Sequence, residues 1–267
     1  MKVCFVAGTL GRGGAERQLL FMLRALKDEG IDSKLLCLTS GEAFEAEVRE
    51  LGIDVEWVGS SSNRIVRLVR IIRAVKAYGA DIVQSAHFYT NLYVALAGRV
   101  LNTPDIGAIR NDLSSELGAD SVFGKWQFRL PRQFIANSEQ AKAKAIAMDQ
   151  RGRKIELVRN VVELPAEPTD RSTVEGYAAR ILFVGRLVQQ KRPEVFIELA
   201  RRLVDGLPDF DLSFDVVGEG PLRAVLEKLR DDSGAAGRKI RFLGEQAEMS
   251  GIYRQSDILV LTSGFEG

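Results

Sequence analysis

Short apolar runs alternate with longer amphipathic stretches along the whole chain. The runs are rich in Val, Ile and Leu, as buried strands are, and the stretches between them repeat their apolar residues at helical spacing. The predicted strands are Val3–Ala7, Ile31–Leu38, Val55–Val58, Asp81–Gln84, Ile106–Ile109, Phe134–Ala136, Ile181–Val184, Phe214–Val217, Ile240–Leu243 and Ile258–Leu261. The predicted helices are Ala15–Leu26, Phe44–Leu51, Arg64–Tyr78, Leu92–Val100, Val195–Val204, Leu222–Leu229 and Ile252–Tyr253. This alternation indicates βαβ crossovers and hence an α/β protein with parallel sheets.

A polar, proline-rich stretch interrupts the alternation at LPAEP and the TDRST that follows it, which is typical of a linker. We therefore predict two Rossmann-like, doubly wound domains over residues 1–163 and 180–267, joined by a linker over residues 164–179. The second pattern stops after a strand, without a helix to complete the crossover, so we expect the second domain to be incomplete. Ligands of such sheets bind at the carboxyl ends of strands, so two domains imply a cleft with both first loops at its rim.

The composition of the chain argues against several classes of function. The 267 residues are 46% hydrophobic and 27% charged, which is typical of a globular protein with ample core. A net charge of +1 gives no argument for nucleic-acid binding, and the two cysteines and one histidine form no metal-binding pattern. The apolar run at the N-terminus is broken by Gly8 and is too short for a signal peptide or a membrane span, so we expect a cytoplasmic protein.

The stretch Ile181–Arg192, ILFVGRLVQQKR, contains a candidate anion site. Its apolar strand ends at Gly185, Arg186 and Lys191 stand at the two ends of a loop, and Pro193 then opens a helix, where proline is well placed. A helix N-terminus offers free N–H groups and the two side chains add positive charge, so the pattern predicts a phosphate or diphosphate site. The alternative is an ordinary solvated loop with two surface cations.

The first loop, Gly8–Gly14, is rich in glycine but fits neither common phosphate-binding motif. The spacing from Gly11 lacks the third glycine of G-x-G-x-x-G, and Ala15 and Glu16 stand where a phosphate loop needs Lys and Ser or Thr. What remains is a glycine-lined helix N-terminus that a phosphate can approach closely. A merely tight βα turn is equally compatible with these residues.

Polar residues follow three of the predicted strands at the edge where ligands bind. His87, the only histidine, follows the fourth strand; Arg110 and Asn111 follow the fifth; Glu266 follows the last. There, His87 is placed to orient a hydroxyl or contact a sugar, Arg110 to contact an anion, and Glu266 to accept hydrogen bonds from sugar hydroxyls. The alternatives are a packed histidine, a structural ion pair, and a glutamate with no role.

The predicted helix Arg64–Tyr78 has a cation at every third position. The cations are Arg64, Arg67, Arg70, Arg73 and Lys76, and the apolar residues between them are Ile65, Leu68, Val69, Ile72 and Val75. Basic amphipathic helices bind anionic membranes. The alternative, which we favour, is a solvated basic face with the apolar face packed on the sheet.

Several motifs together resemble those of the retaining glycosyltransferase family 4, which has the GT-B fold. They are GGAER at Gly13–Arg17, IANSE at Ile135–Glu139, VRNVVELP at Val158–Pro165, ILFVGRLVQQKRPEVFIELA from Ile181, VVGEGPLRAVLE from Val216, IRFLGE from Ile240 and SDILVLTSGFEG from Ser256. They occur in the expected order over nearly the whole chain, and the GR-x4-K and S-x-x-EG pieces make the set specific.

The resemblance implies transfer of a sugar from a nucleotide-sugar donor, with retention of anomeric configuration and with no required metal or cofactor. By this likeness, Arg186 and Lys191 bind the donor diphosphate, and Gly14 supplies backbone to the phosphates from the facing domain. Glu266 matches the first Glu of the family's E-x7-E motif, which touches the donor sugar.

The same likeness places the main chain of Leu243 and Gly244 beside the nucleotide base, and His87, Arg110 and Asn111 on the acceptor side. The family's acceptor-side histidine often stands slightly earlier in the chain than His87. The family's second Glu and its C-terminal helices would follow Gly267, so the resemblance supports the function of a longer chain better than the activity of this one.

We therefore expect a retaining glycosyltransferase that uses a UDP- or GDP-sugar and a saccharide or lipid-linked acceptor in polysaccharide or glycoconjugate synthesis. It would lie in the cytoplasm or at the inner face of the membrane. Two alternatives stay open at this point: a nucleotide-sugar epimerase of the same architecture, and a non-catalytic protein that binds nucleotide sugars.

Overall fold

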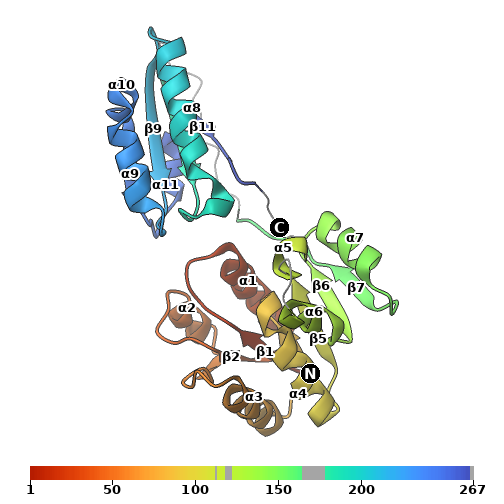
Figure 1. The fold of residues 1–267 in the computed structure, drawn as a ribbon. Coiled ribbons are helices and arrows are strands. Elements are labelled where there is room, and N and C mark those ends of the chain that lie inside the picture. Colours follow the sequence, from red (N-terminus) through yellow and green to blue (C-terminus); the bar gives the residue numbers. More distant parts are fainter. Residues whose placement is uncertain (112, 118–121, 164–177, 265–267) are drawn as a thin grey trace. The chain divides into compact units, whose positions relative to one another are not determined.

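The computed structural model describes residues 1–111, 113–117, 122–163 and 178–264 (Figure 1). The chain divides into two compact units, Met1–Val162 and Glu163–Glu266, which we call unit 1 and unit 2. Each contains a parallel sheet with helices, which confirms the predicted α/β class. Most of the predicted linker, residues 164–177, lies outside the described residues.

In the described part of unit 1, seven strands form one parallel sheet in the order β3-β2-β1-β4-β5-β6-β7. The strands are β1 (Lys2–Ala7), β2 (Asp32–Cys37), β3 (Asp54–Trp57), β4 (Ile82–Ser85), β5 (Asp105–Ile109), β6 (Gln133–Ala136) and β7 (Lys154–Leu157). The helices are α1 (Gly14–Asp28), α2 (Glu45–Glu50), α3 (Arg64–Tyr78), α4 (Asn91–Leu101), α5 (Leu113–Leu117), α6 (Val122–Arg129) and α7 (Glu139–Met148), with a 3₁₀ turn η1 (Phe88–Thr90). The strand order reverses between β1 and β4, and doubly wound sheets bind ligands at such a switch point.

The central strand β1 is buried on both of its faces. Val3, Phe5 and Ala7 pack with α1 and α2, whereas Cys4 and Val6 pack with α3 and α4. A strand covered by helices on both sides needs apolar residues at every position, which is why β1 reads as a continuous apolar run. This burial fixes where the loop after Ala7 leaves the sheet.

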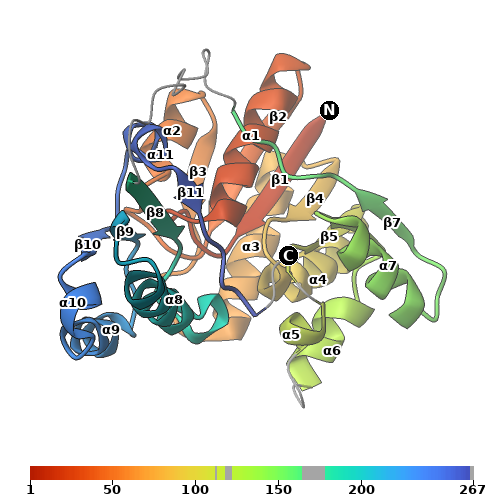
Figure 2. The same cartoon turned by 90° about the horizontal axis from the view of Figure 1, so that it is seen from above.

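Unit 2 repeats the beginning of the same topology. Its described strands pair in the order β10-β9-β8-β11, all parallel (Figure 2). They are β8 (Ala178–Val184), β9 (Asp211–Val217), β10 (Ile240–Gly244) and β11 (Ile258–Leu259), and the helices are α8 (Pro193–Gly206), α9 (Arg223–Asp231), α10 (Gly234–Gly237) and α11 (Ser250–Gln255), with a 3₁₀ turn η2 (Gln189–Lys191). The strand order again reverses, here between β8 and β11.

Three aromatic rings stand at the centre of the core of unit 2. Phe183 on β8 lies 5.6 Å from Phe196 on α8, and Phe196 meets Phe214 on β9 edge-on at 6.1 Å between ring centroids. All three are almost completely buried. Such tilted and edge-on contacts add stabilisation to that of the buried area itself. The core therefore fixes α8, and with it the loop that joins β8 to α8.

The elements that the sequence analysis predicted are all present, with bounds that differ by a few residues. The structure adds α5, α6, α7, β7 and α10, which were not predicted. The helix α7, EQAKAKAIAM, buries mainly alanines, such as Ala141 and Ala145, so its buried face gave no large apolar pattern. The strand β7, KIEL, buries only Ile155 among four residues.

The loops that follow β8 and β9 in unit 2 pack closely against each other, and a glycine substitution tests this packing. Gly218 has φ 131°, and a Cβ there would collide with the carbonyl oxygen of Gly185. We expect Gly218→Ala to lower the free energy of unfolding of unit 2 by about 1–3 kcal/mol, through backbone strain and overpacking. Thermal unfolding measures this, because about 1 kcal/mol corresponds to about 2–4 °C in a protein of this size.

Gly206→Ala is the matched control for that substitution. Gly206 ends α8, and no described atom lies within 4 Å of the position its Cβ would take. We expect this variant to be neutral or more stable by up to about 1 kcal/mol. Equal melting temperatures of the Gly218 and Gly206 variants would contradict the close packing of the two loops.

Candidate active site

The switch point of unit 1 is closed by hydrogen bonds between the loops that follow β1 and β4. The amide of Gly8, directly after β1, donates to Nδ1 of His87 at 3.1 Å. The hydroxyl of Thr90 donates to the carbonyl of Val6 at 3.0 Å, and that of Ser85 to the carbonyl of His87 at 2.7 Å. The two loops are thus held as one surface at the carboxyl edge of the sheet.

His87 uses both of its ring nitrogens within unit 1. Nδ1 accepts from Gly8, so the hydrogen of the neutral ring is on Nε2, which donates to Oε1 of Glu16 at 3.2 Å. His87 is 7% exposed, and its ring stacks on Tyr89, with 5.3 Å between centroids. The structure therefore places His87 at the predicted edge, where it orients Glu16. Its predicted catalytic role stays a prediction.

The sequence analysis did not single out Glu16, although it lies at the centre of this surface. Its carboxylate accepts from His87 and from the hydroxyl of Thr9 at 3.3 Å. Burial alone would raise the pKa of Glu16, but these hydrogen bonds and its own backbone outweigh burial and lower the pKa below its usual value. A Glu three residues after the N-cap Gly13 is the available signal, because this position reaches back over the helix N-terminus.

The carboxylate of Glu16 lies at the N-terminus of α1, where Gly14 is predicted to contact a phosphate. No described atom lies within 4 Å of the position that a Cβ on Gly14 would take, so the backbone there is open to close approach. The side chain of Glu16, however, folds back beside Gly13 at the same helix N-terminus. A negative charge at this end already interacts with the helix dipole. The contact of Gly14 with a phosphate stays a prediction.

Beyond β5 and β6 lie polar groups that are buried without full hydrogen bonding. Asn137 donates through Nδ2 to the carbonyl of Arg110 at 2.9 Å, while its Oδ1 has no partner among the described residues. The same holds for Nε of Arg110, and burial lowers the pKa of that guanidinium. Asn111 follows directly in the same loop. Buried polar atoms without partners are rare, and they mark a place where water or ligand groups bind.

In unit 2, backbone hydrogen bonds join the loops after β8, β9 and β10. The amide of Leu187 donates to the carbonyl of Glu219 at 2.9 Å, and the amide of Gly218 donates to the carbonyl of Gly244 at 2.8 Å. The predicted base-region residues Leu243 and Gly244 therefore lie beside the loop that follows β9. This arrangement sets three loops side by side at the carboxyl edge.

The two predicted cations, Arg186 and Lys191, lie in the loop between β8 and α8. Arg186 is exposed, whereas Lys191 is half-buried, and the stem of Lys191 passes 3.6 Å from the position of a Cβ on Gly185. Lys191 ends the turn η2, and Arg192 follows it in the left-handed conformation, with φ 48° and ψ 50°. Among the described residues, no side chain caps α8. Both cations therefore lie in the loop that leads into α8, with Lys191 two residues before the helix begins, and their contact with a diphosphate stays a prediction.

The loop after β11 folds onto this turn. The hydroxyl of Thr262 lies 2.7 Å from the carbonyl oxygen of Lys191 and 3.0 Å from that of Arg192. The amide of Gly264 donates to the carbonyl of Gln190 at 2.9 Å. Glu266, the predicted contact of the donor sugar, lies outside the described residues.

Two family models match the chain over most of its length. The family described as Glycosyltransferase Family 4 matches residues 12–165, and the family described as Glycosyl transferases group 1 matches residues 178–267. The first match covers more than half of the chain. The chain belongs to glycosyltransferase family 4.

Two relatives of this glycosyltransferase agree with that assignment. An α-1,4-N-acetyl-D-galactosaminyltransferase of Campylobacter jejuni is 26% identical over 276 residues, which cover 100% of this chain and 74% of the relative. The lipopolysaccharide core biosynthesis glycosyltransferase LpsD of Rhizobium meliloti is 23% identical, over 95% of this chain and 69% of its own length.

Solved structures show that the fold is GT-B. Anabaena Alr3699/HepE in complex with UDP-glucose superposes with a TM-score of 0.79 at 19% identity, over 98% of this chain and 74% of that one. TarM superposes with a TM-score of 0.79 at 11% identity, over 100% of this chain and 81% of that one. At these identities the likeness shows the shared fold.

The helix α3 of the glycosyltransferase corrects one prediction. Its buried residues are Ile71, Ala74 and Val75, whereas Ile65 is 72% exposed and Val69 is 39% exposed, although both were assigned to the packed face. Each step of three residues turns a helix by about 300°, so a stripe with this period drifts around the axis and does not stay on one side. The first half of α3 therefore presents apolar and basic side chains together.

Among the helices of the described residues, none combines the length and the apolar character that crossing a membrane requires.

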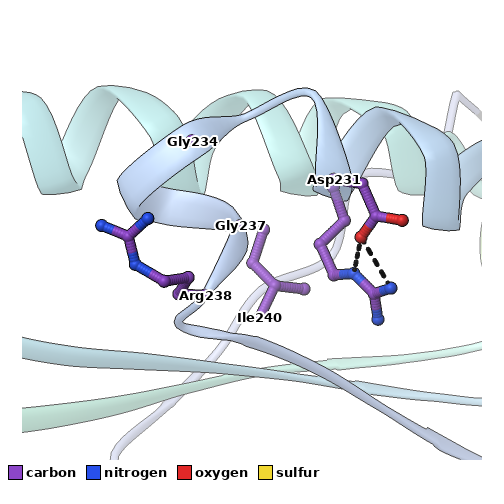
Figure 3. A pocket seen from close by; sticks show the side chains of 6 residues that line it. Asp231, Gly234, Gly237, Arg238 and Ile240 are labelled. Carbon is purple, nitrogen blue, oxygen red and sulfur yellow. Dashed lines mark hydrogen bonds and ion pairs between the residues drawn. The ribbon is translucent and has the colours of Figure 1, made fainter.

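A shallow hollow in unit 2 lies away from the predicted site residues. It is beside Ile240, at the amino end of β10, with Gly234, Gly237 and Arg238 in its wall (Figure 3). Arg230 and Asp231, which also line it, pair with each other at 2.8 Å. None of the predicted site residues lines this hollow.

The buried carboxyl of Glu116, on α5 of unit 1, should make the free energy of unfolding depend on pH. Burial raises the pKa of its carboxyl to about 7. The folded protein therefore binds a proton more readily than the unfolded chain, so this group lowers stability as pH rises from about 4.5 towards 7. We expect Glu116→Gln to raise the free energy of unfolding at pH 8 by on the order of 1–2 kcal/mol, and to leave it nearly unchanged at pH 4.5.

Melting temperatures of wild type and variant, measured across this pH range, check that expectation. Glu139→Gln is the control, because Glu139 is exposed and paired with Arg159 at 3.0 Å on the surface. A constant difference between wild type and Glu116→Gln at all pH values would contradict a buried, titrating carboxyl.

Proposed function

We propose that this glycosyltransferase transfers a sugar, with retention of configuration, from a UDP- or GDP-sugar to a saccharide or lipid-linked acceptor in polysaccharide or glycoconjugate synthesis. The observation that carries the proposal is the loop between β8 and α8. It places Arg186 and Lys191 at the carboxyl edge of unit 2, in the same array of loops as Leu243 and Gly244. Two cations in a loop that leads into a helix start suit a diphosphate, and the neighbouring loop offers main chain to a base.

The names of the relatives support the donor and acceptor classes. Alr3699/HepE was solved with UDP-glucose bound. The Campylobacter enzyme is named for a saccharide carried on PP-undecaprenol, and LpsD is named for lipopolysaccharide core biosynthesis. By analogy we propose a nucleoside-diphosphate sugar as donor and a lipid-linked saccharide as acceptor.

The chemistry follows from the charge that develops during transfer. As the bond from the sugar to the donor phosphate breaks, negative charge grows on the diphosphate and positive charge on the sugar ring. Arg186 and Lys191 would stabilise that leaving group, and fixed charges need no reorganisation during the step. We propose attack on the same face, with the leaving phosphate accepting the proton of the acceptor hydroxyl. We propose that neither a metal nor a further cofactor is required.

Unit 1 would bind the acceptor. Its carboxyl edge presents Glu16, oriented by His87, and the partly unpartnered pair Arg110 and Asn137. Carboxylate and amide oxygens accept hydrogen bonds from sugar hydroxyls, and a guanidinium binds phosphate or carboxylate groups. Asn111 lies in the loop that carries Arg110.

A thermal-shift screen against UDP, GDP, ADP and their sugars tests the donor class. A ligand that binds the folded state raises its melting temperature by mass action. We expect a shift with UDP or GDP, and we expect Lys191→Ala to weaken that binding by about 1.5–3 kcal/mol, or about 10–150-fold, in calorimetry.

The control is Lys239→Ala, which removes a cation just before β10, at the opposite edge of the same sheet. Equal affinities of wild type and Lys191→Ala would remove Lys191 from the site. Donor turnover without transfer to any acceptor would instead favour an epimerase.

We further propose that α3 contacts an anionic membrane. Near its start, Ile65, Val66 and Val69 are exposed beside basic residues, while Arg67 donates to the carbonyl of Ser62 at 2.8 Å and so stays close to the helix start. Exposed apolar side chains flanked by cations are the features of helices that lie in a membrane interface. A lipid-linked acceptor would require such contact.

Flotation with vesicles tests this contact. We expect binding to vesicles that contain phosphatidylglycerol, none to pure phosphatidylcholine, and weaker binding as salt concentration rises. Ile65→Asp should reduce binding about tenfold, because it removes apolar area and adds a negative charge. Ile146→Asp on α7, where Ile146 is 54% exposed, is the matched control. Equal losses in both variants would contradict a specific role of α3.

A further inference from the structure

One side chain joins the loop after β11 to the turn that carries Lys191. The hydroxyl of Thr262 has a single hydrogen, and it lies within hydrogen-bond distance of two carbonyl oxygens, 2.7 Å from that of Lys191 and 3.0 Å from that of Arg192. The hydrogen bond from the amide of Gly264 to the carbonyl of Gln190 lies directly beside it. Residues that are about 70 positions apart in sequence are thereby fixed to each other.

The turn needs such support, because its backbone is strained. Arg192 has a positive φ of 48°, which a residue with a Cβ adopts only when its surroundings hold it there. Arg192 is also the residue that precedes α8, and within the described residues no side chain caps that helix. The direction in which Lys191 leaves the turn depends on this backbone.

Thr262 contacts the backbone of the lysine itself. The amide of Lys191 donates to the carbonyl of Val188 at 3.0 Å, which closes the turn from within. The stem of Lys191 lies over Gly185, at the end of β8. The bond from Thr262 fixes the other side of the same residue, at its carbonyl oxygen. A loss of that bond would free the turn without removing the charge.

We propose that Thr262 is a positioning residue for the diphosphate site: its hydroxyl holds the strained turn at Lys191 and Arg192, and so directs the ammonium group of Lys191 towards the donor diphosphate. This inference rests on the proposed function, because it takes Lys191 as a diphosphate contact. It adds that the loop after β11 and the loop after β8 form one unit, so that contacts to the donor from both loops change together.

The test compares three variants of the full chain by calorimetry with UDP and with GDP, using the one that wild type binds. Thr262→Val keeps the shape of the side chain and removes the hydroxyl, and we expect the dissociation constant to rise about three- to tenfold. Thr262→Ser keeps the hydroxyl and should stay within about twofold of wild type. Ser233→Ala is the control, because it removes a hydroxyl that also donates to a carbonyl, that of Leu229, at the opposite edge of unit 2.

A double-mutant cycle with Lys191→Ala separates positioning from general stability. If Thr262 acts through Lys191, Thr262→Val should have almost no further effect on binding once Lys191 is Ala. If the fold-changes in dissociation constant of the two single variants multiply in the double variant, the inference is overturned. Wild-type affinity in Thr262→Val would also overturn it, and so would weakened binding in Thr262→Ser. Wild-type affinity in Lys191→Ala would overturn the proposed diphosphate site as well. If Lys191→Ala binds weakly while Thr262→Val binds like wild type, the diphosphate site stands and only the role of Thr262 is rejected.

Discussion

The hydrogen bonds across the two switch points are the constraint on which both candidate half-sites depend. In each sheet the first and fourth strands are neighbours, so the loops that follow them emerge side by side. In unit 1 the amide of Gly8 bonds to His87 at 3.1 Å, and in unit 2 the hydroxyl of Thr262 bonds to the carbonyl of Lys191 at 2.7 Å. Parallel pairing of these strands fixes where each loop begins, and the cross-loop hydrogen bonds fix the loops to each other. Precise placement of functional groups requires this kind of support.

The loops and helix starts that follow the first strands of the two units, β1 and β8, carry charges of opposite sign, although the topology is the same. Unit 2 presents Arg186 and Lys191, which suit an anionic group such as a diphosphate. Unit 1 presents the carboxylate of Glu16, whose pKa is lowered through hydrogen bonds with His87 and Thr9. A carboxylate at a helix N-terminus occupies the place where an anion would bind, and it accepts hydrogen bonds from hydroxyl groups instead. The difference in charge fits one unit for the donor and the other for an acceptor rich in hydroxyls.

The sequence revealed the features that depend on short stretches of chain. β1 is buried on both faces and therefore appears as an unbroken apolar run, and the spacing from Gly185 to Lys191 placed both cations in one loop. Glu16, Thr262 and Asn137 were missed as site residues. The place of Glu16 three residues after an N-cap is a local signal, but its contact with His87, like the contacts of Thr262 and Asn137, joins residues far apart in sequence. The bond from Thr262 to Lys191 spans 71 positions, and that from Asn137 to Arg110 spans 27. No local pattern contains such pairs, so only the folded structure shows them.

The incomplete hydrogen bonding of Arg110 and Asn137 has a physical explanation in the same terms. Both residues follow strands at the carboxyl edge of unit 1, and both have a buried polar atom that no described residue satisfies. In a core position such atoms cost stability, and hydrogen bonds with neighbours normally remove that cost. Folded proteins violate such local rules mainly at functional sites, where a ligand supplies the missing partner. The Nε of Arg110 can donate to a ligand oxygen, and the Oδ1 of Asn137 can accept from a ligand hydroxyl or N–H group.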